Sequence, residues 1–501
     1  MNNFKFLSKL SQGLNSTVLL SLIPAIFWVI FLWNFWDKGV YALGFNATIF
    51  AYLLLALFVW VLYRKKHYRR CDLNWLIPLS LLILSYSLYD NPFVKISSLL
   101  LIPIIWAFFY NQAFLLDKDK IFWNFRFLNQ IVIRLFALFN EIPASLRSFL
   151  TLLSPKKANK NVAWRIVVGL LLFVIIAFTI FIPLLSAADA VFAEKLQVIY
   201  EAVMNVFSSV LIYKLLMIIF LALLFLAALR AWSSSFDYKE TRELPKKVDP
   251  IISGIVLAGI LGLYLLFLAI QMSRLWIGSL PFDFQTTETL VKSGFWQLLL
   301  LSIINILIYL TTYRKTSSWV QKILIAFTFA SLLLLASAAY RMALYVTYYG
   351  FSYEKFFASY TVIYAVILFI WLIIKLFATQ RANVLKFVIM LFLWMYALIS
   401  ILPVEQFILR TNLALSRMPD SRIRLFELSM LSPDVLMLVQ KYQKQGLLTE
   451  SVAYLDREGE RKNGEVFEWQ PWITKQEQIV LEKKWYEKNI TNLLYLINHN
   501  Y

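Results

Sequence analysis

The sequence SRLWIGSLPFDFQTTETLVKSGFWQLLLLSIINILIYLTTYRK, Ser273 to Lys315, contains an apolar run long enough to cross a bilayer. A second run, about Ile323 to Tyr340, follows a short basic turn and leads into RMALYVTYYGFSYEK, Arg341 to Lys355. Two such runs in succession predict a pair of antiparallel membrane helices. Charged side chains gather at their outer ends, so this stretch is where we expect specific chemistry or recognition.

The composition extends this prediction to the rest of the chain. Hydrophobic residues make up 60% of the 501 positions, and charged residues only 15%, against roughly a quarter in soluble domains. The apolar residues gather in runs of about twenty, which predicts an all-α integral membrane protein, a bundle of about eleven transmembrane helices. The expected spans are 17–36, 44–63, 73–89, 96–115, 164–186, 206–230, 250–272, 295–313, 323–340, 360–377 and 384–403.

These spans divide the chain into four expected parts. They are four N-terminal spans (1–116), a cytoplasmic connection (117–163), a core of seven spans (164–403) and a small, mostly helical extramembrane domain (404–501). The connection mixes aromatic and basic residues, so it either lies at the membrane interface or packs under the bundle. In the last part, Ser432-Pro433-Asp434 predicts a helix start, Asn463-Gly464 a turn, and Thr474 to Ile497 a final amphipathic helix.

The basic residues predict the orientation. The cluster RKKHYRR, Arg64 to Arg70, follows the second span and favours the cytoplasmic side. With that side inside, 27 Lys and Arg lie in or beside inner loops and seven in outer loops, while the C-terminal domain balances 13 basic with 13 acidic residues. The N-terminus is then cytoplasmic and the C-terminal domain external. The net charge of +19 belongs to the membrane part, which indicates membrane lipids as partners and no nucleic acid.

Polar side chains inside the predicted spans are further candidates for a role. Lys214 is either a functional residue or a side chain that snorkels to the interface. Gln297, Ser302 and Asn305 share one face of a helix, and they either line a cavity or hold helices together by hydrogen bonds. The small residues Gly254, Ala258 and Gly262 recur every four positions, which predicts a close helix contact.

The charged residues at the outer ends of the spans are the candidate site. We expect one external cluster in which Glu288 and Lys292 share a helix face and Arg341 returns to the same membrane surface. The full candidate set is Glu288, Lys292, Arg341, Glu354, Arg274, Asp283 and Asp189. No catalytic signature is present, so the catalytic residues are unknown. One cysteine and two distant histidines predict neither a disulfide framework nor a metal site, and no cofactor is expected.

Several stretches resemble an uncharacterised family of bacterial multi-spanning membrane proteins, a domain of unknown function of the 4153/4173 type. They are LLSAADAVFAEKL (Leu184 to Leu196), ETLVKSGFWQLL (Glu288 to Leu299), AYRMALYVTYYGFSYEK (Ala339 to Lys355), and RTNLALSR with LSMLSPDVL in the tail. The resemblance implies a multi-pass protein of the bacterial inner membrane. It implies no activity.

Two functional interpretations remain open. The first is a non-enzymatic envelope protein that acts in transport, sensing or scaffolding and meets a protein partner through its C-terminal domain. The second is a membrane-embedded enzyme that acts on lipid-linked or envelope substrates at the outer face, with the acidic residues of the candidate set as acid or base.

Overall fold

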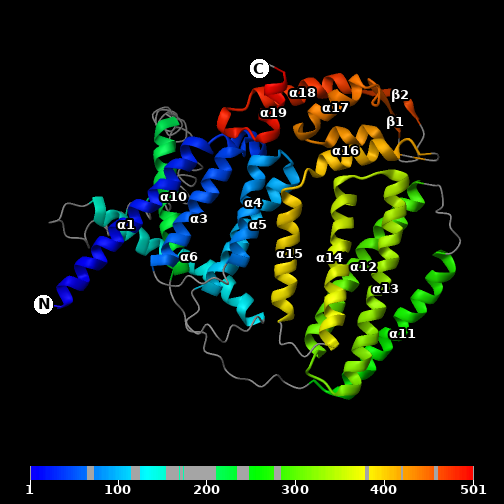
Figure 1. Ribbon diagram of the computed structural model, residues 1–501. Coiled ribbons are helices and arrows are strands. Elements are labelled where there is room, and N and C mark those ends of the chain that lie inside the picture. Colours follow the sequence, from blue (N-terminus) through cyan, green and yellow to red (C-terminus); the bar gives the residue numbers. More distant parts are fainter. Residues whose placement is uncertain are drawn as a thin grey trace, which may run out of the picture. The chain divides into compact units, whose positions relative to one another are not determined.

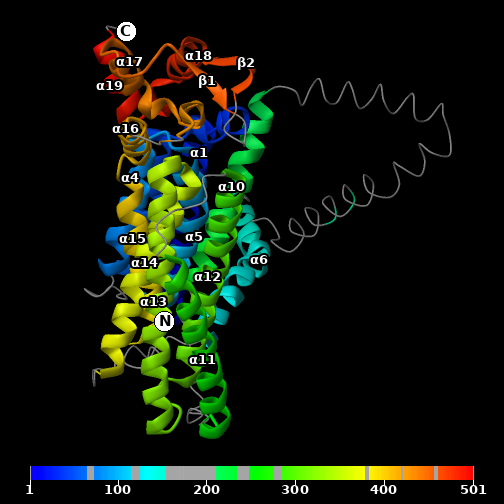
Figure 2. The same ribbon diagram turned by 90° about the vertical axis from the view of Figure 1, so that its right-hand side faces the viewer.

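The computed structural model describes residues 2–64, 73–113, 125–153, 169, 173, 210–233, 248–275, 284–377, 383–418, 421, 423–455 and 461–499. The chain forms two compact units. Unit 1 comprises Met1–Leu76, Leu100–Ile121 and Phe125–Tyr238, and unit 2 comprises Ile77–Leu99, Phe122–Asn124 and Lys239–Tyr501. Figures 1 and 2 show the helices of both units.

Unit 1 is built on α1, α6 and α10, with α3 beside α1. Their bounds, with those of the short α2, are α1 (Asn2–Phe31), α2 (Phe35–Lys38), α3 (Phe45–Arg64), α6 (Phe125–Leu153) and α10 (Val210–Ser233). In the first turn of α3, the Asn46 side chain donates to the carbonyls of Phe31 and Ala42, 2.8 and 2.9 Å away. It thereby fixes the bend between α1 and α3.

The amphipathic connection predicted at 117–163 contains α6. This helix packs along α10 and touches α1, and Arg230 of α10 donates to the hydroxyl of Ser148 at 2.5 Å. On the other side, α6 exposes Phe136 and Phe139. Within unit 1 the helix is therefore packed on one side and exposes aromatic side chains on the other.

Unit 2 consists of a row of long helices with a smaller domain across one end (Figure 1). The row is α11 (Pro250–Leu275), α12 (Phe284–Thr312), α13 (Ser318–Tyr349), α14 (Tyr353–Phe377) and α15 (Val384–Ser400). Its core lies along α13, where Leu324, Phe327 and Leu334 are buried against α11, α12 and α14. Two further helices, α4 (Leu73–Leu88) and α5 (Pro92–Ala113), contribute their ends nearest the Asp90 turn to unit 2.

The helices are long and apolar enough for a multi-pass integral membrane protein. Six described helices qualify as spans by length and composition, or up to eight if two bent pairs each count once, and α4 and α12 contain shorter apolar helices. The bends are 56° after Phe31 and 71° between α15 and α16. Every expected span coincides with a helix except 164–186, of which the structure describes only residues 169 and 173.

Asn305 on α12 connects the helices α11 and α13 by hydrogen bonds. It accepts a hydrogen bond from the Tyr264 hydroxyl on α11 at 2.7 Å and donates to the Ser331 hydroxyl on α13 at 2.9 Å. Nearby, the Tyr309 hydroxyl donates to the Leu372 carbonyl of α14 at 3.1 Å. Such bonds between helices stabilise a membrane bundle by roughly 0.6 kcal/mol each. Asn305 thus holds helices together by hydrogen bonds, the second of the two roles that the sequence left open. Gln297, on the same helix, is exposed.

The small residues of α11 do not form the predicted face. Ala258 and Gly262 are exposed on unit 2, and a Cβ at Gly262 would meet nothing within 4 Å. Gly254 alone is close-packed, because a Cβ there would lie 1.9 Å from the Trp319 ring. The prediction was wrong for Ala258 and Gly262, since the buried face of α11 is set by Leu257 and Tyr264.

We therefore expect Gly254→Leu to lower the melting temperature in detergent, because the new side chain displaces Trp319 at a cost of about 1 kcal/mol or more. Ala258→Leu, one turn further along α11, is the matched control and should leave the melting temperature unchanged. Equal losses in both variants would contradict this assignment of the α11 faces.

The smaller domain of unit 2 contains α16 (Val404–Leu415), α17 (Leu436–Lys444), β1 (Ser451–Leu455), β2 (Arg461–Glu468), α18 (Trp469–Leu481) and α19 (Ile490–Asn498). Two 3₁₀ turns, Leu425–Met430 and Pro433–Val435, precede α17. The strands pair antiparallel, from Ser451 opposite Glu468 to Leu455 opposite Arg461. Trp469 is fully buried, and Trp472 donates its indole N–H to the Ser429 carbonyl at 2.9 Å.

Two details of this domain differ from the prediction. Asn463-Gly464 lies inside β2, so the predicted turn there was wrong. The single helix predicted over 474–497 is also wrong, because α18 ends at Leu481 and Asn489 caps a new helix by accepting the Asn492 backbone N–H at 2.8 Å. In contrast, Ser432 caps the helical segment as predicted, since its side chain accepts the Asp434 N–H.

Candidate functional site

The α4–α5 turn carries a fully buried carboxylate. Asn91 caps α5 by accepting the Val94 N–H at 3.1 Å, and Pro92 follows as the first helical residue, which fixes a tight turn. The preceding residue, Asp90, has no exposed surface. A charge in this position is tolerated only when partners surround it.

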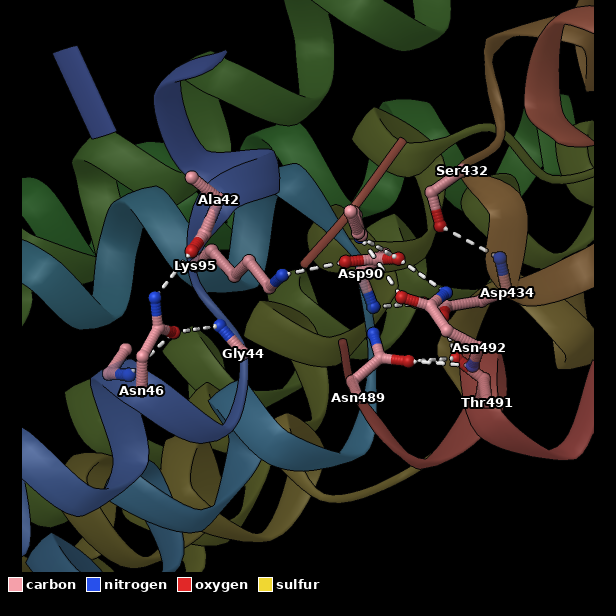
Figure 3. A network of polar contacts seen from close by, with 12 residues as sticks. Ala42, Gly44, Asn46, Asp90, Lys95, Ser432, Asp434, Asn489, Thr491 and Asn492 are labelled. Carbon is pink, nitrogen blue, oxygen red and sulfur yellow. Dashed lines mark hydrogen bonds and ion pairs between the residues drawn. The ribbon is translucent and has the colours of Figure 1, made fainter. Parts of the chain in front are cut away.

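Two lysines and an asparagine supply these partners. Lys95, in the first turn of α5, places Nζ 2.7 Å from one Asp90 oxygen. Lys483, which follows α18, places Nζ 2.6 Å from the other oxygen, and the Asn492 amide of α19 donates to that same oxygen at 2.8 Å. Figure 3 shows Asp90 between Lys95 and Asn492. The turn is thereby bonded to the C-terminal domain.

A second carboxylate, Asp434, lies on the other side of the Asp90 backbone. It accepts the Asp90 N–H at 2.6 Å and the Thr491 hydroxyl at 2.5 Å. The backbone N–H of Asp434 donates to the Ser432 hydroxyl, which caps the helical turn that follows. Through its carboxylate, Asp434 joins its own segment to those of Asp90 and Thr491, which are far away in the sequence.

A third buried acid, Glu405, begins α16. One of its oxygens accepts the backbone N–H and the hydroxyl of Ser432, at 2.8 and 2.6 Å. The other contacts the hydroxyl of Tyr353 in the first turn of α14. We call the set Asp90, Lys95, Glu405, Asp434, Lys483 and Asn492 the polar junction.

The charges of the polar junction shift one another's proton affinity. Burial raises the pKa of Asp90, but the charges of Lys483 and Lys95 and their hydrogen bonds outweigh burial, so its pKa lies below the usual value. Burial, with the nearby charge of Asp434, raises the pKa of Glu405 to about 8. Burial and the charge of Asp90 raise the pKa of Asp434 to about 6. At neutral pH, Asp90 and Asp434 are therefore mostly ionised, while Glu405 is mostly protonated.

This arrangement predicts a pH-dependent stability that Glu405 controls. A raised pKa means that the folded state holds the proton more tightly, so stability falls as pH rises from the unfolded value near 4.3 toward about 8. Between pH 6 and 8 we expect the melting temperature to fall, with a slope of at most roughly 1.4 kcal/mol per pH unit. Asp90, whose pKa is lowered, loses its contribution only in acid.

The measurement is a melting series in detergent from pH 6 to 8 for the wild type and Glu405→Gln. The amide has the size of the acid and cannot ionise, so the variant should show a flatter profile. Taking the difference between the two profiles removes the contribution of every group that titrates alike in both proteins. Parallel profiles would show that Glu405 does not titrate in this range.

Next to the polar junction, unit 2 contains a cavity of about 500 Å³. Its walls come from α12, the α13–α14 turn, α16 and the 3₁₀ turn Leu425–Met430. The apolar lining consists of Trp296, Met342, Tyr345, Phe351, Ala358, Ile408, Phe426, Leu428, Met430 and Leu431, and the polar lining of Ser352, Tyr353, Glu354, Lys355, Arg424 and Glu427.

The α13–α14 turn that walls this cavity is fixed by Asn412 of α16. Gly350 ends α13 with a φ of +70°, a conformation that favours glycine. The Asn412 side chain then accepts the Phe351 N–H at 2.6 Å and donates to the Phe351 carbonyl at 2.8 Å. This pair of bonds satisfies the backbone where the chain reverses between two membrane helices.

The structure describes only part of the candidate set from the sequence. Glu354 is exposed in the first turn of α14 and lines the cavity. Arg341 lies within α13, about two turns before its end, because α13 continues past the predicted span to Tyr349. Glu288 and Lys292 belong to the first turns of α12 and Arg274 to the last turn of α11, with side chains outside the described residues. Asp283 and Asp189 also lie outside them.

The polar residues predicted inside spans have defined surroundings. Lys214 of α10 is half-buried, with Nζ 5.5 Å from the centre of the Trp33 ring in unit 1. A cation over an aromatic face is stabilised by roughly 0.5–2 kcal/mol. Among the described residues, no group of three His, Cys, Asp or Glu side chains is arranged to hold a metal ion.

Sequence reasoning missed the polar junction. Of its members, only Asp434 enters the predictions from the sequence, as part of a helix start. A usable signal is the isolated charge at the end of an apolar run, as at Asp90 and at Glu405, which follows Pro403. No spacing rule pairs Asp90 with Lys483, because 393 positions separate them.

Comparison with known proteins identifies the family. The family described as Domain of unknown function (DUF4153) matches residues 76–439, which include α11 to α16, the start of α17 and the residues of the polar junction up to Asp434. No curated protein and no solved structure matches the chain. Because the match covers well over half of the sequence, the chain belongs to this family of multi-pass membrane proteins, the domain of unknown function DUF4153.

Proposed function

We propose that this chain is a non-enzymatic protein of the bacterial inner membrane with eleven spans. Its C-terminal domain is bound to the outer ends of the helices and forms a binding surface. In this proposal the N-terminus is cytoplasmic, and a partner of the envelope meets the domain 404–501. The observation that carries it is the ion pairing of one buried carboxylate, Asp90, with Lys95 and Lys483.

The polar junction supports the outer position of the domain without relying on the number of spans. Helix α4 separates the basic cluster 64–70 from Asp90. If the basic cluster is cytoplasmic, as the charge rule predicts, and α4 crosses the membrane, Asp90 is on the outer side. The C-terminal domain binds Asp90 directly and therefore belongs to the same side.

The non-enzymatic role is supported by how the acids are used. Both Asp90 oxygens accept from lysine, and Asp434 and Glu405 are bound by protein donors as well. The space beside Glu405 and Asp434 is only about 10 Å³, roughly one water molecule. Buried, fully partnered charges of this kind hold one arrangement of segments in place.

The experiment compares a deletion strain with strains that carry the wild type or Glu405→Gln. If the acids are structural, Glu405→Gln should restore whatever envelope defect the deletion causes, provided that protease resistance shows a docked domain. An enzyme that uses Glu405 as acid or base would instead leave a docked but inactive variant. Mass spectrometry of envelope lipids should then also show a substrate accumulating in the deletion strain, which our proposal does not expect.

A further inference from the structure

The 500 Å³ cavity has the size and lining of a ligand site. Ligand cavities commonly range from roughly 300 to 1,000 Å³ and combine a mostly apolar wall with a few polar groups. Here the apolar lining includes Trp296, Met342 and Phe351, and the lining also has four charged groups, Glu354, Lys355, Arg424 and Glu427. Such a lining fits a ligand that is itself amphipathic.

The location of the cavity along the helices points to a lipid. It is walled by the turn between α13 and α14, both long enough to cross a membrane, so it lies where the apolar core gives way to water. Tyr345 and Tyr353 line it, and tyrosines concentrate at this level of a bilayer. Trp296 and Met430 are 60% and 76% exposed, which leaves the apolar rim open to acyl chains.

The four charges specify the headgroup. Two are cationic and two are anionic, so the lining has no net charge. Arg424 Nη2 lies 2.7 Å from Glu427 Oε1, and Lys355 Nζ lies 4.6 Å from the centre of the Tyr345 ring and donates to the Tyr349 carbonyl at 3.2 Å. A purely anionic headgroup would face two carboxylates, whereas a phosphate beside an ammonium group can satisfy both signs.

We infer that this cavity binds a phospholipid with a zwitterionic headgroup, one phosphate and one primary ammonium. The phosphate meets Lys355 and Arg424, the ammonium meets Glu354 and Glu427, and an acyl chain lies against Trp296 and Met430. The inference needs α13 and α14 to span a membrane, but it does not depend on which side the cavity faces. Its failure is therefore separate from a failure of the proposed function.

Native mass spectrometry of the delipidated protein tests the inference. The probes are phosphatidylethanolamine, phosphatidylglycerol and glycerophosphoethanolamine, which has the headgroup without the chains. We expect phosphatidylethanolamine to bind at least about tenfold more tightly than phosphatidylglycerol, a difference of about 1.4 kcal/mol. Glycerophosphoethanolamine should bind more weakly than phosphatidylethanolamine. Equal binding of the two lipids would overturn the inference.

Two variants locate the lipid. Ala358→Trp fills the cavity and should abolish the preference, whereas Ile363→Trp, on an exposed face of the same helix α14, should keep it. Glu427→Lys gives the lining a net positive charge and should move the preference toward phosphatidylglycerol by about tenfold. If Ala358→Trp does not fold, the Glu427→Lys variant tests the inference. An unchanged preference for phosphatidylethanolamine over phosphatidylglycerol in that variant would contradict the assignment of the headgroup.

Discussion

Replacing Asp90 with asparagine should destabilise the protein by about 3–5 kcal/mol, the largest effect of any single substitution that we expect. The amide keeps the shape of the carboxylate but removes its charge, which leaves the ammonium groups of Lys95 and Lys483 buried opposite a neutral partner. Both lysines are almost fully buried, at 1% and 4% exposure, so water cannot compensate. The C-terminal domain should then detach from the α4–α5 turn.

The measurements are the melting temperature in detergent and the rate at which a protease releases the domain 404–501. Glu427→Gln is the matched control, because its ion pair with Arg424 has the same length but lies partly in solvent. Exposed pairs contribute at most about 1 kcal/mol. A double variant, Asp90→Asn with Lys483→Met, should lose less than the two single variants together. Strict additivity would mean that the two residues do not act as a pair.

The second large effect is expected at Asn412. Its substitution by alanine leaves the N–H and the carbonyl of Phe351 without their partners at the turn between α13 and α14. A buried backbone group left unsatisfied costs roughly 1–3 kcal/mol. We therefore expect a marked loss of stability, together with weaker lipid binding if the cavity holds a lipid, because Phe351 lines it.

The same melting assay measures this effect. Ser416→Ala, at the end of the same helix, removes only a local hydrogen bond to the Leu413 carbonyl and should change stability by less than about 0.5 kcal/mol. Asn412→Asp puts a carboxylate oxygen in place of the amide that donates to the Phe351 carbonyl, so it should be at least as unstable as the alanine variant. If the alanine and aspartate variants have the same melting temperature as the wild type, the turn does not depend on Asn412.

The membrane helices could be predicted because each apolar run carries its own signal. Runs such as 44–63 and 360–377 are long enough to span, and the structure has the helices α3 and α14 there. The ends of the helices were harder to predict, because a helix can continue past the apolar run into polar sequence. For this reason α12 begins at Phe284 and α13 ends at Tyr349, beyond the predicted spans, and Arg341 lies inside a helix that continues past it.

Contacts between distant segments could not be predicted. Asp90 reads as an ordinary turn residue, and Lys483 reads as part of a charged helix face, because nothing local says that both are buried. The helix predicted over 474–497 failed for the same reason. Its pattern is amphipathic throughout, but Lys483 binds Asp90 and Asn489 starts a new helix, so the chain breaks between them.

The cavity itself was not predicted from the sequence. The sequence indicated that the outer ends of the helix pair at 273–355 carry the chemistry, and Glu354 and Lys355 do line the cavity. The other charged residues of the cavity, Arg424 and Glu427, come from a 3₁₀ turn and the residue before it, some seventy positions further along the chain. Only the folding of the C-terminal domain onto the helix ends brings them there.

The central claim is that the C-terminal domain is on the outer face, on the opposite side of the membrane from the basic cluster. The most direct test labels cysteines in intact cells with a maleimide that does not cross the inner membrane. The only native cysteine, Cys71, follows the basic cluster and is the internal control. A second cysteine is introduced at Glu450, which is exposed beside β1, in a background with and without Cys71→Ser. We predict that the cysteine at position 450 is labelled in intact cells and that Cys71 is labelled only after the cells are lysed. Labelling of position 450 only after lysis, or of both cysteines from the same side, would contradict the account.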